Sequence, residues 1–186
     1  MKNWKVYTIA AVAPLALAAC ATDEMTSSQA NMVAENNAVS DVHDAEIAEL
    51  NELVSIYIDA STLYDEAADI PDNDEAVRDE LQSLASERAK ERDDLQARVI
   101  ALGGRPDEMG QAVGTGHRAF TQLRTLVDQD SEVAIEEVLR GEKYIAEEID
   151  EALEGTITVE TREMLTALKS ETQQNIADLE KLDRQA

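Results

Sequence analysis

Apolar residues recur along most of the chain at alternating spacings of four and three, which places their side chains on one face of an α-helix. The clearest stripe consists of Val77, Leu81, Leu84, Leu95, Val99 and Leu102. Gly103, Gly104 and Pro106 follow it directly, and glycine followed by proline is a typical helix end. The pattern therefore predicts a helix that opens within residues 72–75 and ends before Gly103.

Three further stripes predict three more helices, and no segment has the alternation typical of a strand. The first helix is expected to begin near Asp41, the third to run over 131–153, and the fourth to be capped near Thr158. The stripe members are His43, Ile47, Leu50, Val54, Tyr57, Ser61, Tyr64 and Ala68 in the first helix; Ile135, Val138, Glu142, Ile145, Ile149 and Ala152 in the third; and Thr161, Leu165, Leu168, Thr172, Asn175, Leu179 and Leu182 in the fourth.

The connections between these helices predict the topology. Short turns join helices one and two and helices three and four, so each pair must form an antiparallel hairpin. The connection from Gly103 to about Gln129 is long enough to recross the bundle, and residues 115–127 within it have the pattern of a short helix. The sequence therefore predicts an all-α fold over residues 41–186, a ferritin-like four-helix bundle with one long crossover.

Each apolar stripe is interrupted near its middle by a polar residue. The positions of this predicted polar core layer are Ser61, Arg88, Glu142, Thr172 and Asn175. The planar guanidinium of Arg88 suits a carboxylate, and Glu142 is the most central one. We therefore expect a buried Arg88–Glu142 pair that fixes the register of the helices. Placement of Arg88 on the helix surface is the alternative.

Metals bind at this depth in ferritin-like bundles, where two helices give one glutamate each and the other two give Glu-x-x-His. This chain departs from that set at nearly every position, with Ser61, Glu87-x-x-Lys90 and Glu171-x-x-Gln174 in place of the expected ligands. The only histidines, His43 and His117, lie away from the layer. We therefore expect no cofactor. If a metal does bind, the candidate ligands are Glu87, Glu91 and Glu142.

The N-terminus has the pattern of a secretory signal. Two lysines precede the apolar segment 6–17, and Leu17-Ala18-Ala19-Cys20 follows. This motif resembles the lipobox of bacterial lipoproteins, which implies that residues 1–19 are removed and that Cys20 is acylated. An ordinary signal peptide with a chance cysteine is the alternative. Ala21, rather than aspartate, favours the outer membrane over the inner membrane. Residues 20–40 are polar and are expected to form a flexible tether.

The chain of 186 residues has 40 acidic against 16 basic residues, a net charge of −24. Such a surface repels nucleic acid and anionic lipid headgroups and attracts cations or a basic protein. A solvated acidic surface that keeps the protein in solution is the simpler explanation. The expected partners are therefore the membrane, through the lipid at Cys20, and an envelope protein or further copies of the chain.

Three elements in order carry a family resemblance: residues 102–106 (Leu-Gly-Gly-Arg-Pro), 116–118 (Gly-His-Arg) and 140–142 (Arg-Gly-Glu). Together they resemble an uncharacterised family of bacterial four-helix-bundle proteins in the ferritin-like superfamily, over about residues 45–184. The resemblance implies a ferritin-like bundle and brings no established activity. By position, Glu142 matches the family's carboxylate on the third helix, and His117 matches its crossover histidine.

No serine–histidine–acid order, phosphate-binding loop or nucleotide fingerprint is present, so hydrolase and kinase functions have no support. Two hypotheses remain. The first is a lipid-anchored envelope bundle without catalysis that acts as a binding, structural or stress-associated module. The second is a ferritin-like metal-handling protein or oxidase with a reduced carboxylate site around Glu142. The sequence favours the first hypothesis.

Overall fold

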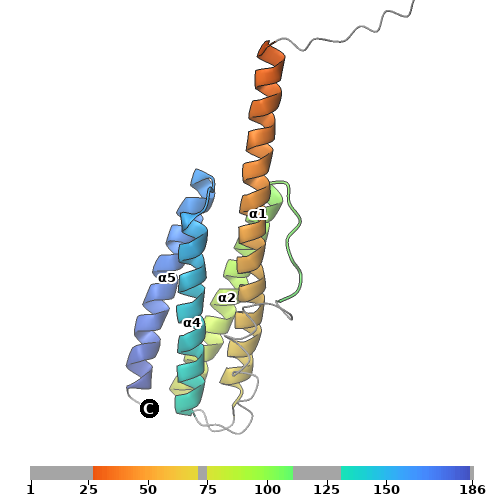
Figure 1. Cartoon of the computed structure of the whole chain (residues 1–186). Coiled ribbons are helices and arrows are strands. Elements are labelled where there is room, and N and C mark those ends of the chain that lie inside the picture. Colours follow the sequence, from red (N-terminus) through yellow and green to blue (C-terminus); the bar gives the residue numbers. More distant parts are fainter. Residues whose placement is uncertain (1–26, 71–74, 111–130, 185–186) are drawn as a thin grey trace, which may run out of the picture.

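The computed structural model describes residues 27–70, 75–110 and 131–184. These residues form four α-helices: α1 (Ser27–Ala68), α2 (Glu75–Ala101), α4 (Ser131–Glu154) and α5 (Val159–Asp183). They pack as an all-α four-helix bundle, and no strand occurs in the described ranges. The predicted fold class is confirmed (Figure 1). The predicted signal segment 1–19, Cys20 and the predicted short helix at 115–127 lie outside the described residues.

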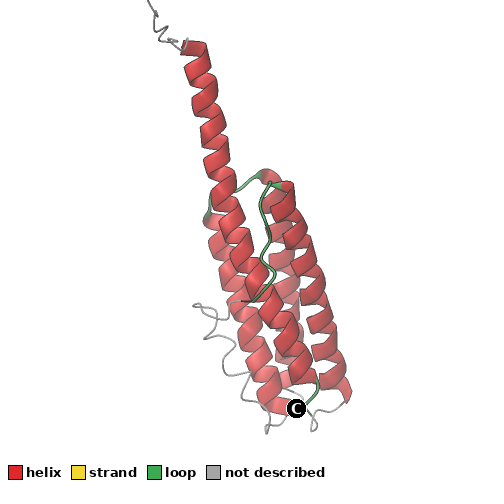
Figure 2. Cartoon of the chain, turned by 90° about the vertical axis from the view of Figure 1, so that its right-hand side faces the viewer, coloured by secondary structure: helices red, strands yellow, loops and turns green. Residues whose placement is uncertain are grey.

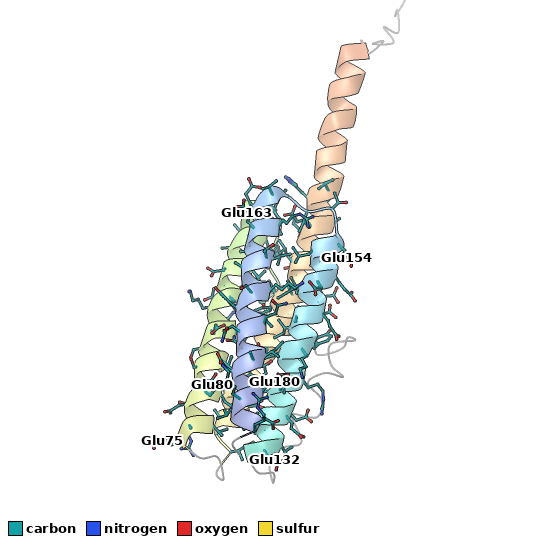
Figure 3. All side chains as sticks on the ribbon, turned by 90° about the vertical axis from the view of Figure 1, so that its left-hand side faces the viewer. Glu75, Glu80, Glu132, Glu154, Glu163 and Glu180 are labelled. Atoms are coloured by element: carbon teal, nitrogen blue, oxygen red, sulfur yellow. The ribbon has the colours of Figure 1, made fainter. Side chains whose placement is uncertain are left out.

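The bundle consists of two antiparallel hairpins, α1–α2 and α4–α5, which make the most extensive helix contacts. Glu75 and Glu132, near the starts of α2 and α4, lie at one end of the bundle, whereas Glu154 and Glu163 lie at the other end (Figure 3). Helices α2 and α4 are therefore parallel, as the long connection predicts. A simple up-down-up-down bundle would make them antiparallel.

The apolar stripes form the core. The stripe of α4 is completely enclosed, and its members Ile135, Val138, Ile145 and Ile149 are 0% exposed. On α1 the buried face is wider than the predicted stripe, because Leu53, Ile56, Ala60, Leu63 and Ala67 are buried as well. Helix α1 contacts both α2 and α4, so two adjacent faces of this helix are covered.

Helix α2 ends in the way that its glycines predict. The amide of Gly104 donates to the carbonyl of Val99 and the amide of Gly103 to that of Ile100, which is the Schellman pattern. Gly103 has a φ of 88°, a left-handed conformation that glycine adopts without steric cost.

Residues 102–110 then run back along α1. Asn51 donates to the carbonyl of Arg105 and accepts from the amide of Asp107, and Gln96 of α2 donates to the carbonyl of Asp107. These hydrogen bonds fix the first part of the crossover.

Helix α1 begins at Ser27, well before the predicted start at Asp41. The expectation of a flexible tether is therefore wrong from residue 27 onward. No glycine or proline lies between Pro14 and Pro71, so nothing in the sequence interrupts the helix there. The first part of α1 projects beyond the other helices (Figures 1 and 2). Among the helices that the structure describes, none combines the length and the apolar character of a membrane span.

Candidate functional site

A buried arginine lies at the centre of the bundle. Arg88 of α2 is 0% exposed, and its Nε and Nη2 donate to Oε1 and Oε2 of Glu142 on α4 at 3.0 and 2.7 Å. Its Nη1 donates to Oε2 of Glu91, one turn further along α2. Because an unpaired buried charge is costly, Arg88 needs these carboxylates. The structure forms the pair that the interrupted stripes predict, and it rules out the surface placement of Arg88.

Two tyrosines of α1 enclose this charged group. The Cζ of Arg88 lies 5.5 Å from the centroid of the Tyr57 ring, within the range of a cation–π interaction. Tyr57 and Tyr64 are 0% exposed, and no hydrogen bond of normal geometry reaches their hydroxyl oxygens from the described residues. Burial raises the pKa of both hydroxyls, and the nearby Glu142 raises that of Tyr64 further. Both side chains therefore stay neutral.

A second group of polar residues lies beside this pair, between α2 and α5. Glu87, Glu91 and Glu171 each place a carboxylate oxygen within 4.8 Å of the others, and we refer to these three residues as the carboxylate cluster. Asn175 of α5 donates to Oε1 of Glu87 at 2.7 Å. Glu91 is 4% exposed, whereas Glu171 is exposed to solvent. The cluster therefore reaches from the buried layer to the surface.

Glu91 is the unusual member of the carboxylate cluster. Its Oε2 accepts from Arg88, whereas its Oε1 is buried and has no hydrogen-bond partner among the described residues. Burial raises the pKa of Glu91 to about 8, because the attraction of Arg88 only partly offsets burial and Glu171 adds to the shift. Two carboxylates this close need a shared proton or a bound cation to avoid repulsion.

The other residues of the predicted polar core layer lie at different depths. Thr172 is 0% exposed, and its hydroxyl donates to the carbonyl of Leu168. Asn175 is partly buried and bonds to Glu87 rather than to the central pair. Ser61 is also partly buried, and its hydroxyl donates to the carbonyl of Ile58 in its own helix. The expectation that Ser61 belongs to the polar core layer is therefore wrong, because the wide buried face of α1 leaves this residue at its edge.

The structure separates the three candidate metal ligands. Glu87 and Glu91 lie together, whereas Glu142 is bound to Arg88 by both of its oxygens and does not belong to the carboxylate cluster. The third member, Glu171, is absent from the candidates that the sequence gives. Its spacing from Asn175 places both residues on one side of α5, but only the packing of α5 on α2 brings that side to Glu87.

Another buried carboxylate, nearer the end of the bundle from which α1 projects, connects three helices. Glu46 of α1 accepts hydrogen bonds from the amide and the hydroxyl of Thr158, the N-cap of α5, and Arg98 of α2 lies 3.5 Å from its Oε1. Arg98 also donates to the hydroxyl of Thr161. Glu46 falls outside the predicted stripe of α1, so sequence reasoning misses this group.

Residues 45–155 match the family described as Domain of unknown function (DUF2383), and this segment is more than half of the chain. The chain belongs to the DUF2383 family. The match includes Arg88, Glu91 and Glu142 and stops before α5, so the DUF2383 segment is shorter than the expected resemblance over 45–184. Glu171 lies outside it. No curated protein matches the chain.

Proposed function

We propose that this DUF2383 protein is a lipid-anchored, ferritin-like four-helix bundle of the bacterial cell envelope that acts without catalysis as a binding, structural or stress-associated module. Its partner would be an envelope protein or a second copy of the chain. The anchor is supported by the lipobox-like residues 17–20 after an apolar segment. It is also supported by the start of α1 at Ser27, seven residues after Cys20, at the tip of a helix that projects from the bundle.

The Arg88–Glu142 pair supports the proposal that the protein acts without catalysis. Both oxygens of Glu142 accept hydrogen bonds from one guanidinium, and Arg88 is always charged. A metal at the centre of the bundle would have to displace this cation and leave it buried without its partner, which costs several kcal/mol. The centre of the fold therefore favours a structural role over chemistry.

Metal handling is the second candidate, and the carboxylate cluster is the observation that favours it. Three carboxylates within 4.8 Å are a ligand set for a hard cation. The set excludes Glu142, however, and it contains no imidazole. It therefore supports cation binding between α2 and α5 rather than an oxidase centre around Glu142.

The anchor is tested by expressing the chain with Cys20→Ser in a bacterium and comparing it with the wild type. We expect the wild type to be processed, to partition into the detergent phase and to fractionate with the outer membrane. The variant should remain uncut or appear in the aqueous phase, because it lacks the sulfur that carries the lipid.

Thr22→Ser, two residues further along, is the matched control and should behave as the wild type. Unchanged processing and partitioning of the Cys20→Ser variant would refute the lipid anchor. Crosslinking of the anchored protein in intact cells then tests the binding role: recovery of monomer alone would argue against a partner or a homo-oligomer.

A further inference from the structure

The contact between α2 and α5 is much smaller than either hairpin contact. Acidic residues of the two helices lie close to one another across it. We refer to Glu80, Glu87 and Glu91 of α2 with Glu171 and Asp178 of α5 as the acidic seam. The three residues of α2 are seven and four positions apart, and the two of α5 are seven apart, so each set lies on one side of its helix. The seam between α2 and α5 lies on the side of the bundle that faces the viewer in Figure 3.

Like charges across the acidic seam repel one another. The pKa of Glu80 is raised first by burial and then by the charges of Asp178 and Glu87, so these carboxylates are close enough to interact. Opposite charges would stabilise such an interface between two helices, whereas like charges destabilise it. Lys181 offsets the charge of Asp178 at one end of the seam, so the carboxylate cluster is the part that most needs a positive charge.

Arg88 cannot supply all of that charge. Its guanidinium donates twice to Glu142 and once to Oε2 of Glu91, and only a longer contact of 3.7 Å reaches Glu87. Oε1 of Glu91 is buried and receives no hydrogen bond from a donor among the described residues. Its carboxylate belongs to the carboxylate cluster, and Glu171 lies close enough to raise the pKa of Glu91. A buried acceptor without a donor, beside two further carboxylates, is an arrangement that a cation would complete.

We propose that Glu87, Glu91 and Glu171 together bind one divalent cation, which bridges α2 and α5. The ligands are all oxygens, which suit Ca²⁺, Mg²⁺ or Mn²⁺ rather than a thiophilic metal. Mg²⁺ demands near-ideal octahedral geometry and gives up its water reluctantly, whereas Ca²⁺ accepts flexible sets of carboxylates. We therefore expect Ca²⁺ to bind the cluster better than Mg²⁺.

The site is accessible from solvent. Glu171 is exposed and the Glu87 side chain is 35% exposed, so a hydrated cation can reach the cluster and keep water on its outer side. Glu91 would bind the ion through Oε1 while its Oε2 stays with Arg88. The ion would therefore connect α5 to the central pair, and its expected role is to stabilise the bundle.

The proposal is tested by thermal unfolding of the full chain, purified in detergent and stripped with a chelator, in Ca²⁺, in Mg²⁺ and in NaCl of matched ionic strength. At a free Ca²⁺ concentration about a hundredfold above its dissociation constant, the unfolding midpoint should rise by about 5–10 °C. Mg²⁺ should give a smaller rise, and NaCl should give little. Absence of a Ca²⁺-specific rise would overturn the site.

Glu171→Gln is the decisive variant, because Glu171 is exposed and its replacement leaves Arg88 and its partners intact. This change should weaken Ca²⁺ binding at least about tenfold and, at the same Ca²⁺ concentration, remove about half of the rise or more. Glu163→Gln, which removes an exposed carboxylate from the same helix outside the seam, should keep the full rise. Equal responses of the two variants would show general screening of an acidic protein and would overturn the proposal. Glu91→Gln should also lose the response.

Discussion

Replacing Glu142 with alanine is expected to destabilise the bundle by about 3–5 kcal/mol. Glu142 is 0% exposed and receives two of the three hydrogen bonds that Arg88 makes to carboxylates. The substitution leaves a guanidinium that is also 0% exposed with Glu91 as its remaining close carboxylate. Glu91 is itself raised in pKa by burial, so it is a poor replacement for the lost charge.

The magnitude follows from the charge that is left behind. Removal of one partner from a buried ion pair costs about 3–5 kcal/mol, whereas an exposed pair contributes about 1 kcal/mol or less. The chain should therefore unfold about 6–20 °C lower. Glu142→Gln should cost less, because its amide oxygen still accepts from Arg88 although its charge is lost.

Urea unfolding followed by circular dichroism measures these differences, provided that the slope of the transition is unchanged. Glu147→Ala on the same helix is the matched control: Glu147 is exposed, and its removal should change stability by less than about 0.5 kcal/mol. The double variant Arg88→Leu with Glu142→Leu should recover much of the loss, because the apolar pair leaves no stranded guanidinium and Glu91, whose pKa burial raises to about 8, can take up a proton.

Two results would refute this reasoning. If Glu142→Ala were as mild as Glu147→Ala, Glu142 would not be the buried partner of Arg88. If the double variant were as unstable as the sum of the single variants Arg88→Leu and Glu142→Leu, the loss would come from side-chain packing rather than from an unpaired charge.

Two further predictions concern the ends of the helices. Burial raises the pKa of Glu46, but hydrogen bonds from Thr161 and Thr158, together with Arg98, outweigh it and hold the pKa below its ordinary value. The resulting stabilisation of the folded chain is fully present at pH values above the ordinary pKa of a glutamate, and it is lost as the pH falls through the pKa that Glu46 has in the folded state. Glu46→Gln should therefore have a lower urea midpoint than the wild type at neutral pH and the same midpoint as the wild type in acid. An equal difference in midpoint at both pH values would contradict this prediction. The second prediction concerns Gly103, whose φ of 88° is unfavourable for a residue with a side chain. Gly103→Ala should lower the free energy of unfolding by about 1 kcal/mol, and Gly103→Asn should lower it less. Urea unfolding measures both differences, and equal stability of all three proteins would contradict the left-handed cap.

The sequence by itself determined the four helices, the parallel arrangement of α2 and α4, and the glycine cap of α2. These features depend on residues close together in the chain or on the length of one connection. The Arg88–Glu142 pair could be predicted for a related reason. Each residue is the charged interruption of an otherwise apolar stripe, and such stripes face the same core.

Only the tertiary structure decided which residues the polar side chains at the edges of those stripes contact. Glu171 joins Glu87 and Glu91, Glu46 reaches Thr158, and Ser61 turns away from the arginine. Each of these outcomes depends on how far a helix rotates about its own axis and slides against its neighbours. A stripe of apolar residues fixes that rotation only roughly, because a helix can bury a wider face than its stripe, as α1 does. The polar contacts of this bundle therefore follow from packing geometry that residue spacing does not contain.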